Sequence, residues 1–289
     1  MAGRALTAFA LAAALGAVAT GCGAGDGDPP AEPTAGTVAD PLPSAFPSPA
    51  PGQTLAKFAT RVSGASARLR LATTVHPVGH ARFAFTVQRD GRPLAGPTVL
   101  YASPAADRSE VAGPLPAPGT AVATAAGAGA TVYEVPAVDL HHRGRYDLLT
   151  LTETGHGELV AGRARVGALP PGRDPAPDVG ERVTLPSALA ARTRGGPAAL
   201  ILPGRCPPGD CADLAAAMSK PSLALGERVA VVRPGPRAER ELRRELALSP
   251  SPWLLTLDAD GRLAARLEGA VSPQTAERAL QAAIVRSGG

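Results

Sequence analysis

The pattern of apolar and polar positions divides this chain of 289 residues into successive stretches. An uncharged apolar run occupies 5–18, and residues 23–54 show no periodicity. From Leu55 to Gly167 apolar residues recur at every second position, whereas beyond residue 182 short apolar runs alternate with segments of helical period. Period two indicates half-buried strands, and a period of about 3.6 indicates amphipathic helices. The pattern therefore predicts a leader, a spacer, a β-rich domain and a mixed domain.

The β-rich domain is expected over residues 55–168. Leu69 and Leu71 alternate with Arg68 and Arg70, and Asp90-Gly91 is a hairpin signal. Further alternating segments lie at 83–87, 131–135, 145–152 and 158–166. Short alternating strands separated by turns predict an antiparallel, immunoglobulin-like β-sandwich. Residues 113–130, nearly all Pro, Gly, Ala, Thr and Val, are predicted to form a long loop.

The mixed domain is expected over residues 182–289, after a Pro-rich linker at 169–181. Strands are predicted at 197–202, 228–232, 253–257 and 263–267, and helices at 210–218, at 237–246 and after Ser272. Ser272 is an N-cap residue followed by Pro273, which suits the first helical position. This alternation of strand and helix predicts an α/β domain. The whole chain is thus predicted to be a multidomain α+β protein.

Composition excludes several classes of protein. Aromatic residues make up 3% of the chain, so the cores must be built mainly from Ala, Leu and Val. The net charge is +4 and basic residues do not cluster, which argues against a nucleic-acid partner. Neither a Gly-x-Ser-x-Gly nor a His-Glu-x-x-His motif is present, so a hydrolase has little support. No cofactor is expected.

The leader has the layout of a signal peptide over residues 1–21. Arg4 supplies the positive start, and the apolar run is too short to span a membrane. The run ends in Ala19-Thr20-Gly21-Cys22, which resembles the lipobox of bacterial lipoproteins. The resemblance implies cleavage before Cys22, lipidation of its thiol, and anchoring at the extracytoplasmic face of the cell membrane. The alternative is an ordinary secreted protein in which Cys22 is incidental.

The spacer after the anchor, residues 22–54, is predicted to be a disordered tether. Pro, Gly, Ala, Ser and Asp dominate it, and such a segment cannot bury enough apolar surface to become ordered. Pro-rich chains extend by about 3.1 Å per residue, so the tether could reach roughly 100 Å.

Cys206 and Cys211 remain as a pair if lipidation uses Cys22, and a pair in an exported protein favours a disulfide. The segment 251–262, Ser-Pro-Trp-Leu-Leu-Thr-Leu-Asp-Ala-Asp-Gly-Arg, resembles the stretch that follows the cis-proline of thioredoxin-like proteins. The resemblance implies a thioredoxin-like fold. It also implies that Pro252 is a cis-proline lying against the active-site disulfide, and that Pro252 and Trp253 bind substrate.

A second resemblance concerns the β-rich domain. Gly79–Phe85 resembles the start of a β-domain that precedes a thioredoxin-like domain in certain actinobacterial exported proteins. Those proteins often carry a Cys-x4-Cys motif, which the spacing of Cys206 and Cys211 matches.

Two functions remain open for the Cys pair. Cys206 follows Arg205, which favours it as the attacking thiol, with Cys211 as the resolving thiol. The protein would then be a thiol-disulfide oxidoreductase or disulfide carrier with an extracytoplasmic protein partner. However, Arg205 replaces the usual Trp and four residues separate the cysteines. The alternative is a binding or adaptor lipoprotein in which the disulfide is structural.

A metal site is not expected. His76 and His80 are predicted to lie in a solvated turn, because Pro77 and Gly79 interrupt any helix. A copper chaperone with paired cysteines would need a His after the pair, but the last His is His156.

Overall fold

The computed structural model describes residues 38–105, 110–123, 129–170, 176–193, 195–204 and 228–288, together with Asp174, Met218 and Leu225. All of these belong to one compact unit, Ala35–Gly289. The leader, the lipobox with Cys22, and the Cys206–Cys211 segment lie outside the described residues.

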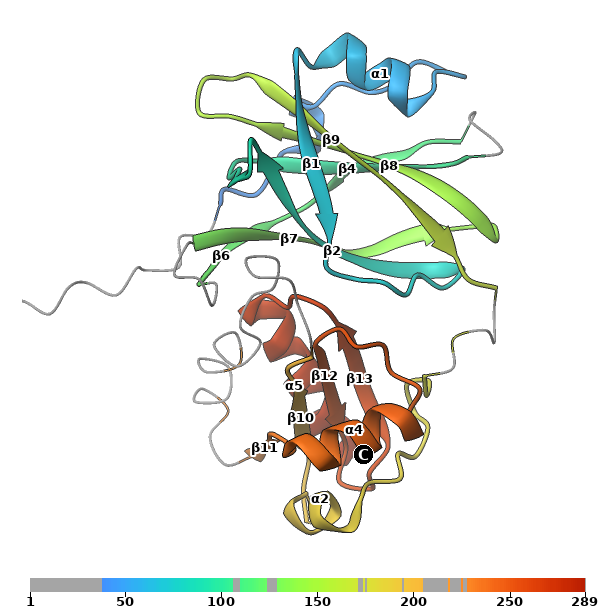
Figure 1. Ribbon diagram of the computed structural model, residues 1–289, viewed down its shortest axis with the longest axis vertical. Helices are drawn as coiled ribbons and strands as arrows, with labels where there is room; N and C mark the ends of the chain where they lie inside the picture. The colour runs from blue at the N-terminus through green and yellow to red at the C-terminus, as the bar shows by residue number, and fades with distance from the viewer. Residues whose placement is uncertain are drawn as a thin grey trace, which may run out of the picture. The chain divides into compact units, whose positions relative to one another are not determined.

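Nine strands form one large sheet that curls on itself (Figure 1). They are β1 (Ala65–Leu71), β2 (Gly79–Arg89), β3 (Arg92–Pro93), β4 (Thr98–Pro104), β5 (Ala112–Pro116), β6 (Gly119–Ala123), β7 (Gly129–Leu140), β8 (Gly144–Glu153) and β9 (Leu159–Ala168). Their order is β5-β4-β8-β9-β1-β2-β7-β6, and β3 pairs with β2. Every pairing is antiparallel except that of β1 with β9.

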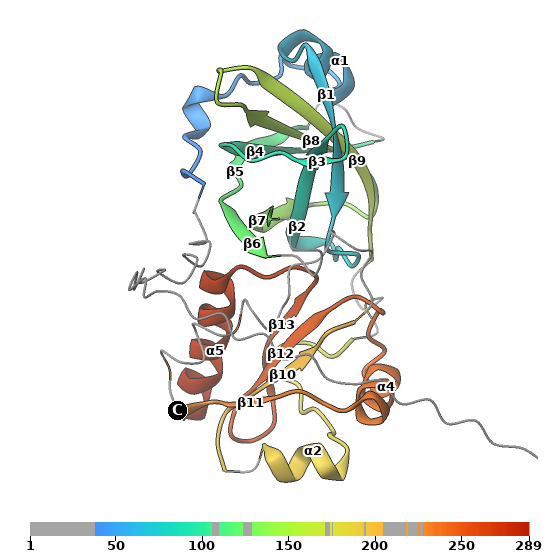
Figure 2. The same cartoon turned by 60° about the vertical axis from the view of Figure 1, so that its left-hand side comes forward.

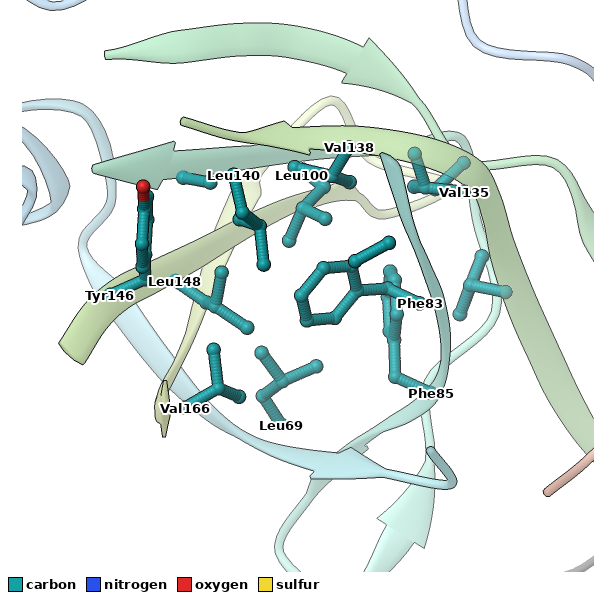
Figure 3. Packing of buried hydrophobic residues seen from close by; sticks show 14 of the residues in the cluster. Leu69, Phe83, Phe85, Leu100, Val135, Val138, Leu140, Tyr146, Leu148 and Val166 are labelled. Atoms are coloured by element: carbon teal, nitrogen blue, oxygen red, sulfur yellow. The ribbon is translucent and has the colours of Figure 1, made fainter. Parts of the chain in front are cut away.

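The concave face of this sheet encloses the main core (Figure 3). Because side chains alternate along a strand, Leu69 of β1 and both Phe83 and Phe85 of β2 point to the same interior. Leu100, Leu148 and Val166 meet them from β4, β8 and β9. The alternation that the sequence showed in β1 and β2 is therefore confirmed.

The opposite face is covered by the N-terminal segment. Helix α1 (Leu55–Val62) begins at Thr54, whose side chain accepts a hydrogen bond from the Lys57 N–H at 3.2 Å. Phe58 is fully buried and meets Tyr101 edge to face at 5.3 Å. A short 3-10 turn, η1 (Pro43–Ala45), precedes the buried Phe46. Residues 38–54, expected to belong to the tether, thus include side chains that pack on the sheet.

A second, four-stranded sheet follows, with the order β11-β10-β12-β13. Its elements are β10 (Ala198–Leu202), β11 (Ala230–Val232), β12 (Trp253–Leu257) and β13 (Leu263–Glu268), with helices α2 (Ser187–Arg192), α4 (Pro236–Glu245) and α5 (Pro273–Ser287). Strands β10 and β11 are parallel, and the other pairs are antiparallel. Leu200 and Leu202 pack with Leu242 of α4, while Ala199 and Ile201 pack with α5. These two helices therefore lie on opposite faces (Figure 2).

The predicted fold class is wrong. Strands make up 42% and helices 21% of the described residues, so the protein is mostly β rather than a multidomain α+β chain of an immunoglobulin-like sandwich and a thioredoxin-like domain. A sandwich needs two separate sheets, but the parallel pairing of β1 with β9 joins the strands into one. Alternation cannot distinguish the two arrangements, because each buries one face of every strand.

Individual elements were predicted with mixed success. The strands near 197–202, 228–232, 253–257 and 263–267, the helix near 237–246 and the one after Ser272 are confirmed. The loop predicted at 113–130 is wrong, because β5 and β6 and the start of β7 occupy it. Its small residues still pair their backbones with neighbouring strands, as Leu115 does with Leu100. The helix predicted at 210–218 lies outside the described residues apart from Met218.

Gly269 follows β13 and contacts the loop after β1. It has a φ of 80°, and a Cβ there would overlap the carbonyl group of Ala72. Gly91, in the β2–β3 turn, has a similar φ of 74°, but a Cβ would meet nothing within 4 Å. The two glycines therefore share a backbone conformation and differ in crowding.

Replacing Gly269 by Ala should lower the free energy of unfolding more than replacing Gly91 by Ala. Left-handed backbone costs an L-residue about 1–2 kcal/mol at either position, and overpacking against Ala72 should add about 1–3 kcal/mol only at Gly269. Urea denaturation of both variants measures the difference. Equal losses would contradict the close contact between Gly269 and Ala72.

Candidate functional site

The chain enters the cysteine segment beside Pro252. Gly204 has a φ of 65°, and a Cβ on it would lie 2.5 Å from both the Pro252 nitrogen and the Ser251 carbonyl oxygen. Only glycine fits such a close approach to another backbone. Cys206 and Cys211 lie outside the described residues, but Gly204, two positions before Cys206, contacts the Ser251–Pro252 peptide.

Pro252 and Trp253 are buried at the start of β12. The expected cis-proline is not found: the Ser251–Pro252 bond is not cis, and the cis bond among the described residues is Gly113–Pro114. The Pro252 carbonyl accepts the Gly269 N–H at 2.8 Å. Trp253 is 3% exposed, and its indole N–H donates to the carbonyl and hydroxyl oxygens of Ser249, each at 3.2 Å. Its donor is therefore already used within the protein.

A cavity of about 160 Å³ with mixed polar and apolar walls opens next to Trp253. It is lined by the loop after β1 (Thr73, Val75, Pro77), the start of β2 (His80, Arg82), Asp174, and strands β12 and β13 (Trp253, Arg266, Glu268). Trp253 pairs across the strands with Glu268, and Arg266 lies two positions earlier in β13. Side chains two apart share a face of a sheet, which explains why these three residues converge.

Glu268 ties the loop after β1 to strand β13. Its carboxylate accepts the N–H groups of Thr74 and Val75, each at 2.9 Å, and the Ser249 hydroxyl at 2.6 Å. The Thr74 hydroxyl donates to it as well. Although Glu268 is only 6% exposed, its oxygens are thus satisfied by neutral donors.

Arg82 connects the large sheet to the end of β13. Its Nε donates to Glu134 at 2.6 Å, while Nη1 and Nη2 donate to the carbonyls of Glu268 and Ala270 at 2.7 and 2.5 Å. Glu134 also accepts the Thr275 hydroxyl at 2.8 Å, from the first turn of α5. Arg82 occupies the outward position of the β2 alternation, where its charge is half-buried and bound to protein acceptors, including two carbonyls at the end of β13.

Two residues that line the cavity, Arg266 and Thr73, each have a buried donor atom without a partner in the part of the chain that the structure describes. Arg266 donates through Nη2 to Asp174, but its Nη1 is buried without a hydrogen bond. The Thr73 hydroxyl is likewise unpaired, and Thr73 is 4% exposed. Asp174 also accepts the Ala176 N–H at 3.0 Å. The carboxylates are therefore satisfied, whereas hydrogen-bond donors are left over.

His76 belongs to the loop after β1, and the prediction that it is solvated is wrong. It is 3% exposed and stacks on Phe83 with the ring centroids 4.3 Å apart. Burial lowers its pKa to about 4, against the opposing effects of Glu268 and the Thr73 backbone. His76 is therefore neutral at physiological pH.

No metal cluster is evident: within the described ranges no three His, Cys, Asp or Glu side chains come together as ligands. None of the helices described here is both long and apolar enough to cross a membrane. The chain matches no protein-family model and no curated protein.

Sequence reasoning missed most of the cavity. Arg82, Arg266 and Glu268 occupy strand positions that the alternation assigns to the polar side, where solvent is the usual neighbour. Thr73 carries no motif. The one usable signal was the segment 251–262, which drew attention to Pro252 and Trp253.

The lowered pKa of His76 should make the fold sensitive to acid. The unfolded chain takes up the proton near the ordinary value of 6.5, but the folded chain does so only near 4. The contribution of neutral His76 is therefore complete above pH 6.5 and is lost as pH falls towards 4, by up to about 3 kcal/mol. Urea unfolding at several pH values measures this loss.

His76→Phe keeps an aromatic ring against Phe83 and should flatten the pH dependence between pH 6.5 and 4. His156→Gln, at an exposed turn, is the control and should leave it unchanged. The same slope in His76→Phe as in the wild type would show that His76 does not cause the acid sensitivity.

Proposed function

We propose that this protein is a lipoprotein anchored through Cys22 at the extracytoplasmic face of the cell membrane, and that Cys206 and Cys211 exchange disulfides with an extracytoplasmic protein partner. The observation that carries the redox part is the contact of Gly204 with the Ser251–Pro252 peptide. It places Gly204, two positions before Cys206 in the sequence, against the residue that precedes Trp253 of the cavity wall. The anchor part rests on the sequence of the leader and Cys22.

The chemistry is ordinary thiol–disulfide exchange. The Cys206 thiolate attacks one sulfur of a partner disulfide, which releases a partner thiolate and forms a mixed disulfide. Cys211 then attacks the Cys206 sulfur, so that the second partner thiol leaves and a Cys206–Cys211 disulfide remains. The partner is reduced by two electrons and the pair is oxidised by two. Run in reverse, the same steps oxidise a partner dithiol.

The alternative is a non-catalytic binding lipoprotein in which the disulfide is structural. The burial of Trp253 favours this structural alternative, because the indole is almost fully buried and its N–H donates to Ser249. Such a Trp presents little surface to a redox partner.

The reduction potential of the pair distinguishes the two functions. We expect a soluble form lacking residues 1–22 to equilibrate with a thiol buffer at a potential between about −270 and −120 mV, the range of known exchange proteins. Cys206→Ser should abolish reduction of a disulfide substrate. Cys211→Ser is the matched control and should accumulate the mixed disulfide, because it keeps the attacking thiol. A potential below roughly −300 mV would instead identify a structural disulfide.

Membrane attachment has its own test. In a bacterial host that lipidates exported proteins, the full chain should fractionate with membranes, and Cys22→Ser should be released because the acyl chains have no attachment point. Cys206→Ser, which keeps Cys22, is the control and should stay membrane-bound. Equal membrane fractions for the wild type and Cys22→Ser would refute the anchor.

A further inference from the structure

We propose that the outer face of strands β8, β9 and β1 docks the protein onto the anionic headgroups of a phospholipid membrane. The side chains that carry this inference are Arg68, Arg145, Arg163 and Arg165, and we call them the arginine face. The inference names the surface that the anchored protein contacts, and it rests on the proposed anchor at Cys22 for holding the chain near a membrane.

The arginine face arises from alternation on neighbouring strands. Strands β8, β9 and β1 are adjacent in the large sheet (Figure 1). Tyr146 of β8, Val166 of β9 and Leu69 of β1 belong to the core. Each arginine of the face is an odd number of positions away from one of these on the same strand, so it points to the opposite side of the sheet. All four arginines are exposed, and the sheet gathers them from segments that are distant in sequence.

The arginines are only partly neutralised by carboxylates. Arg165 is paired with Asp147 at 2.6 Å, but Arg68, Arg145 and Arg163 have no ion pair among the residues that the structure describes. Arg68 and Arg163 are also direct partners across the β1–β9 pair. Like charges directly opposite each other destabilise a sheet, and an anionic partner would relieve this repulsion.

The surroundings of the face leave its charge positive. Besides Asp147, Asp90 in the turn after β2 borders the face, because it lines a hollow of about 390 Å³ together with Arg68. Four guanidinium groups thus stand against two carboxylates. Nearer to α1, the outward Glu153 of β8 is outnumbered by Lys57 and Arg61, both exposed on that helix. A surface of this kind attracts anionic lipid, and guanidinium groups bind phosphate with two parallel N–H donors.

The N-terminal connection holds the large sheet close to the proposed anchor. Val38 is the sixteenth residue after Cys22, and its N–H donates to the Gly119 carbonyl of β6 at 3.0 Å. A segment of that length spans at most about 58 Å when fully extended. Phe46 and Phe58, farther along, are buried against the same sheet. A lipidated Cys22 would therefore keep the arginine face within reach of the headgroups. This restraint, rather than charge alone, favours a membrane over a nucleic acid.

Vesicle sedimentation tests the docking without the anchor. The soluble form lacking residues 1–22 is mixed with vesicles of phosphatidylglycerol and phosphatidylcholine in equal parts. We expect it to sediment with these vesicles at low salt and to stay in solution with vesicles of phosphatidylcholine alone. Raising the salt to about 1 M, where the Debye length is about 3 Å, should release it.

Arg68→Gln combined with Arg163→Gln should weaken binding to the anionic vesicles about 25-fold, which is about fivefold for each arginine. Stability should not fall, because the change removes a contact between like charges. The matched control is Arg237→Gln combined with Arg240→Gln, which removes the same charge from exposed positions of α4 and should bind like the wild type.

The proposal is overturned if the soluble form sediments equally with both kinds of vesicle, or if the Arg68 and Arg163 double variant binds as tightly as the control. It is also overturned if double-stranded DNA binds the soluble form more tightly than the anionic vesicles do, which would identify a nucleic-acid surface.

The anchor and the docking face fail separately. The vesicle assay contains no acyl chain on the protein, so its failure would leave the anchor standing. In the fractionation of the full chain, a wash with about 1 M salt screens the docking contact. Retention of Cys22→Ser on membranes after that wash would refute the anchor and leave the vesicle result intact.

Discussion

The arrangement of the protein depends on one half-buried guanidinium, whose side chain is 14% exposed. Arg82 uses Nε, Nη1 and Nη2 to bind Glu134 on the same large sheet and two carbonyls at the end of β13. Removing one partner of a buried ion pair costs about 3–5 kcal/mol, because the other charge is left uncompensated. The contact of Glu134 with Thr275 and the contacts of Glu268 with the loop after β1 extend the same network. The two sheets are thus joined by directional polar contacts.

This polar junction also creates the cavity. Glu268 holds the loop after β1 through backbone N–H groups, and Thr73 of this loop is one of the residues that line the cavity. Arg266 is oriented by Asp174, so that only one of its terminal nitrogens is satisfied. Trp253, Arg266 and Glu268 stand on strands, and side chains on supported strands are better organised for binding than side chains on a free loop. The same carboxylate therefore serves both the stability of the junction and the geometry of the candidate site.

The wrong predictions of the fold class and of the exposure of His76 have the same physical cause. Alternation in β1 and β2 predicted correctly which side chains face the core, but a sandwich and a curled sheet use the same alternation. The parallel pairing of β1 with β9 distinguishes the curled sheet from a sandwich. It joins residues about a hundred positions apart in sequence, so no local sequence pattern predicts it. His76 was likewise assigned to solvent from Pro77 and Gly79 alone, although its ring is buried on Phe83.

The sequence by itself determined the four strands of the second sheet with helices α4 and α5, the inward face of β1 and β2, and the resemblance of the leader to that of a lipoprotein. These depend on periodicity, caps and short motifs, which are local properties of the chain. Only the tertiary structure decided that Arg82 binds the end of β13, that Gly204 meets Pro252, and that Thr73 and Arg266 line one cavity. Each of these unites segments distant in sequence, and such contacts are selected by global packing and by the pairing of buried polar groups.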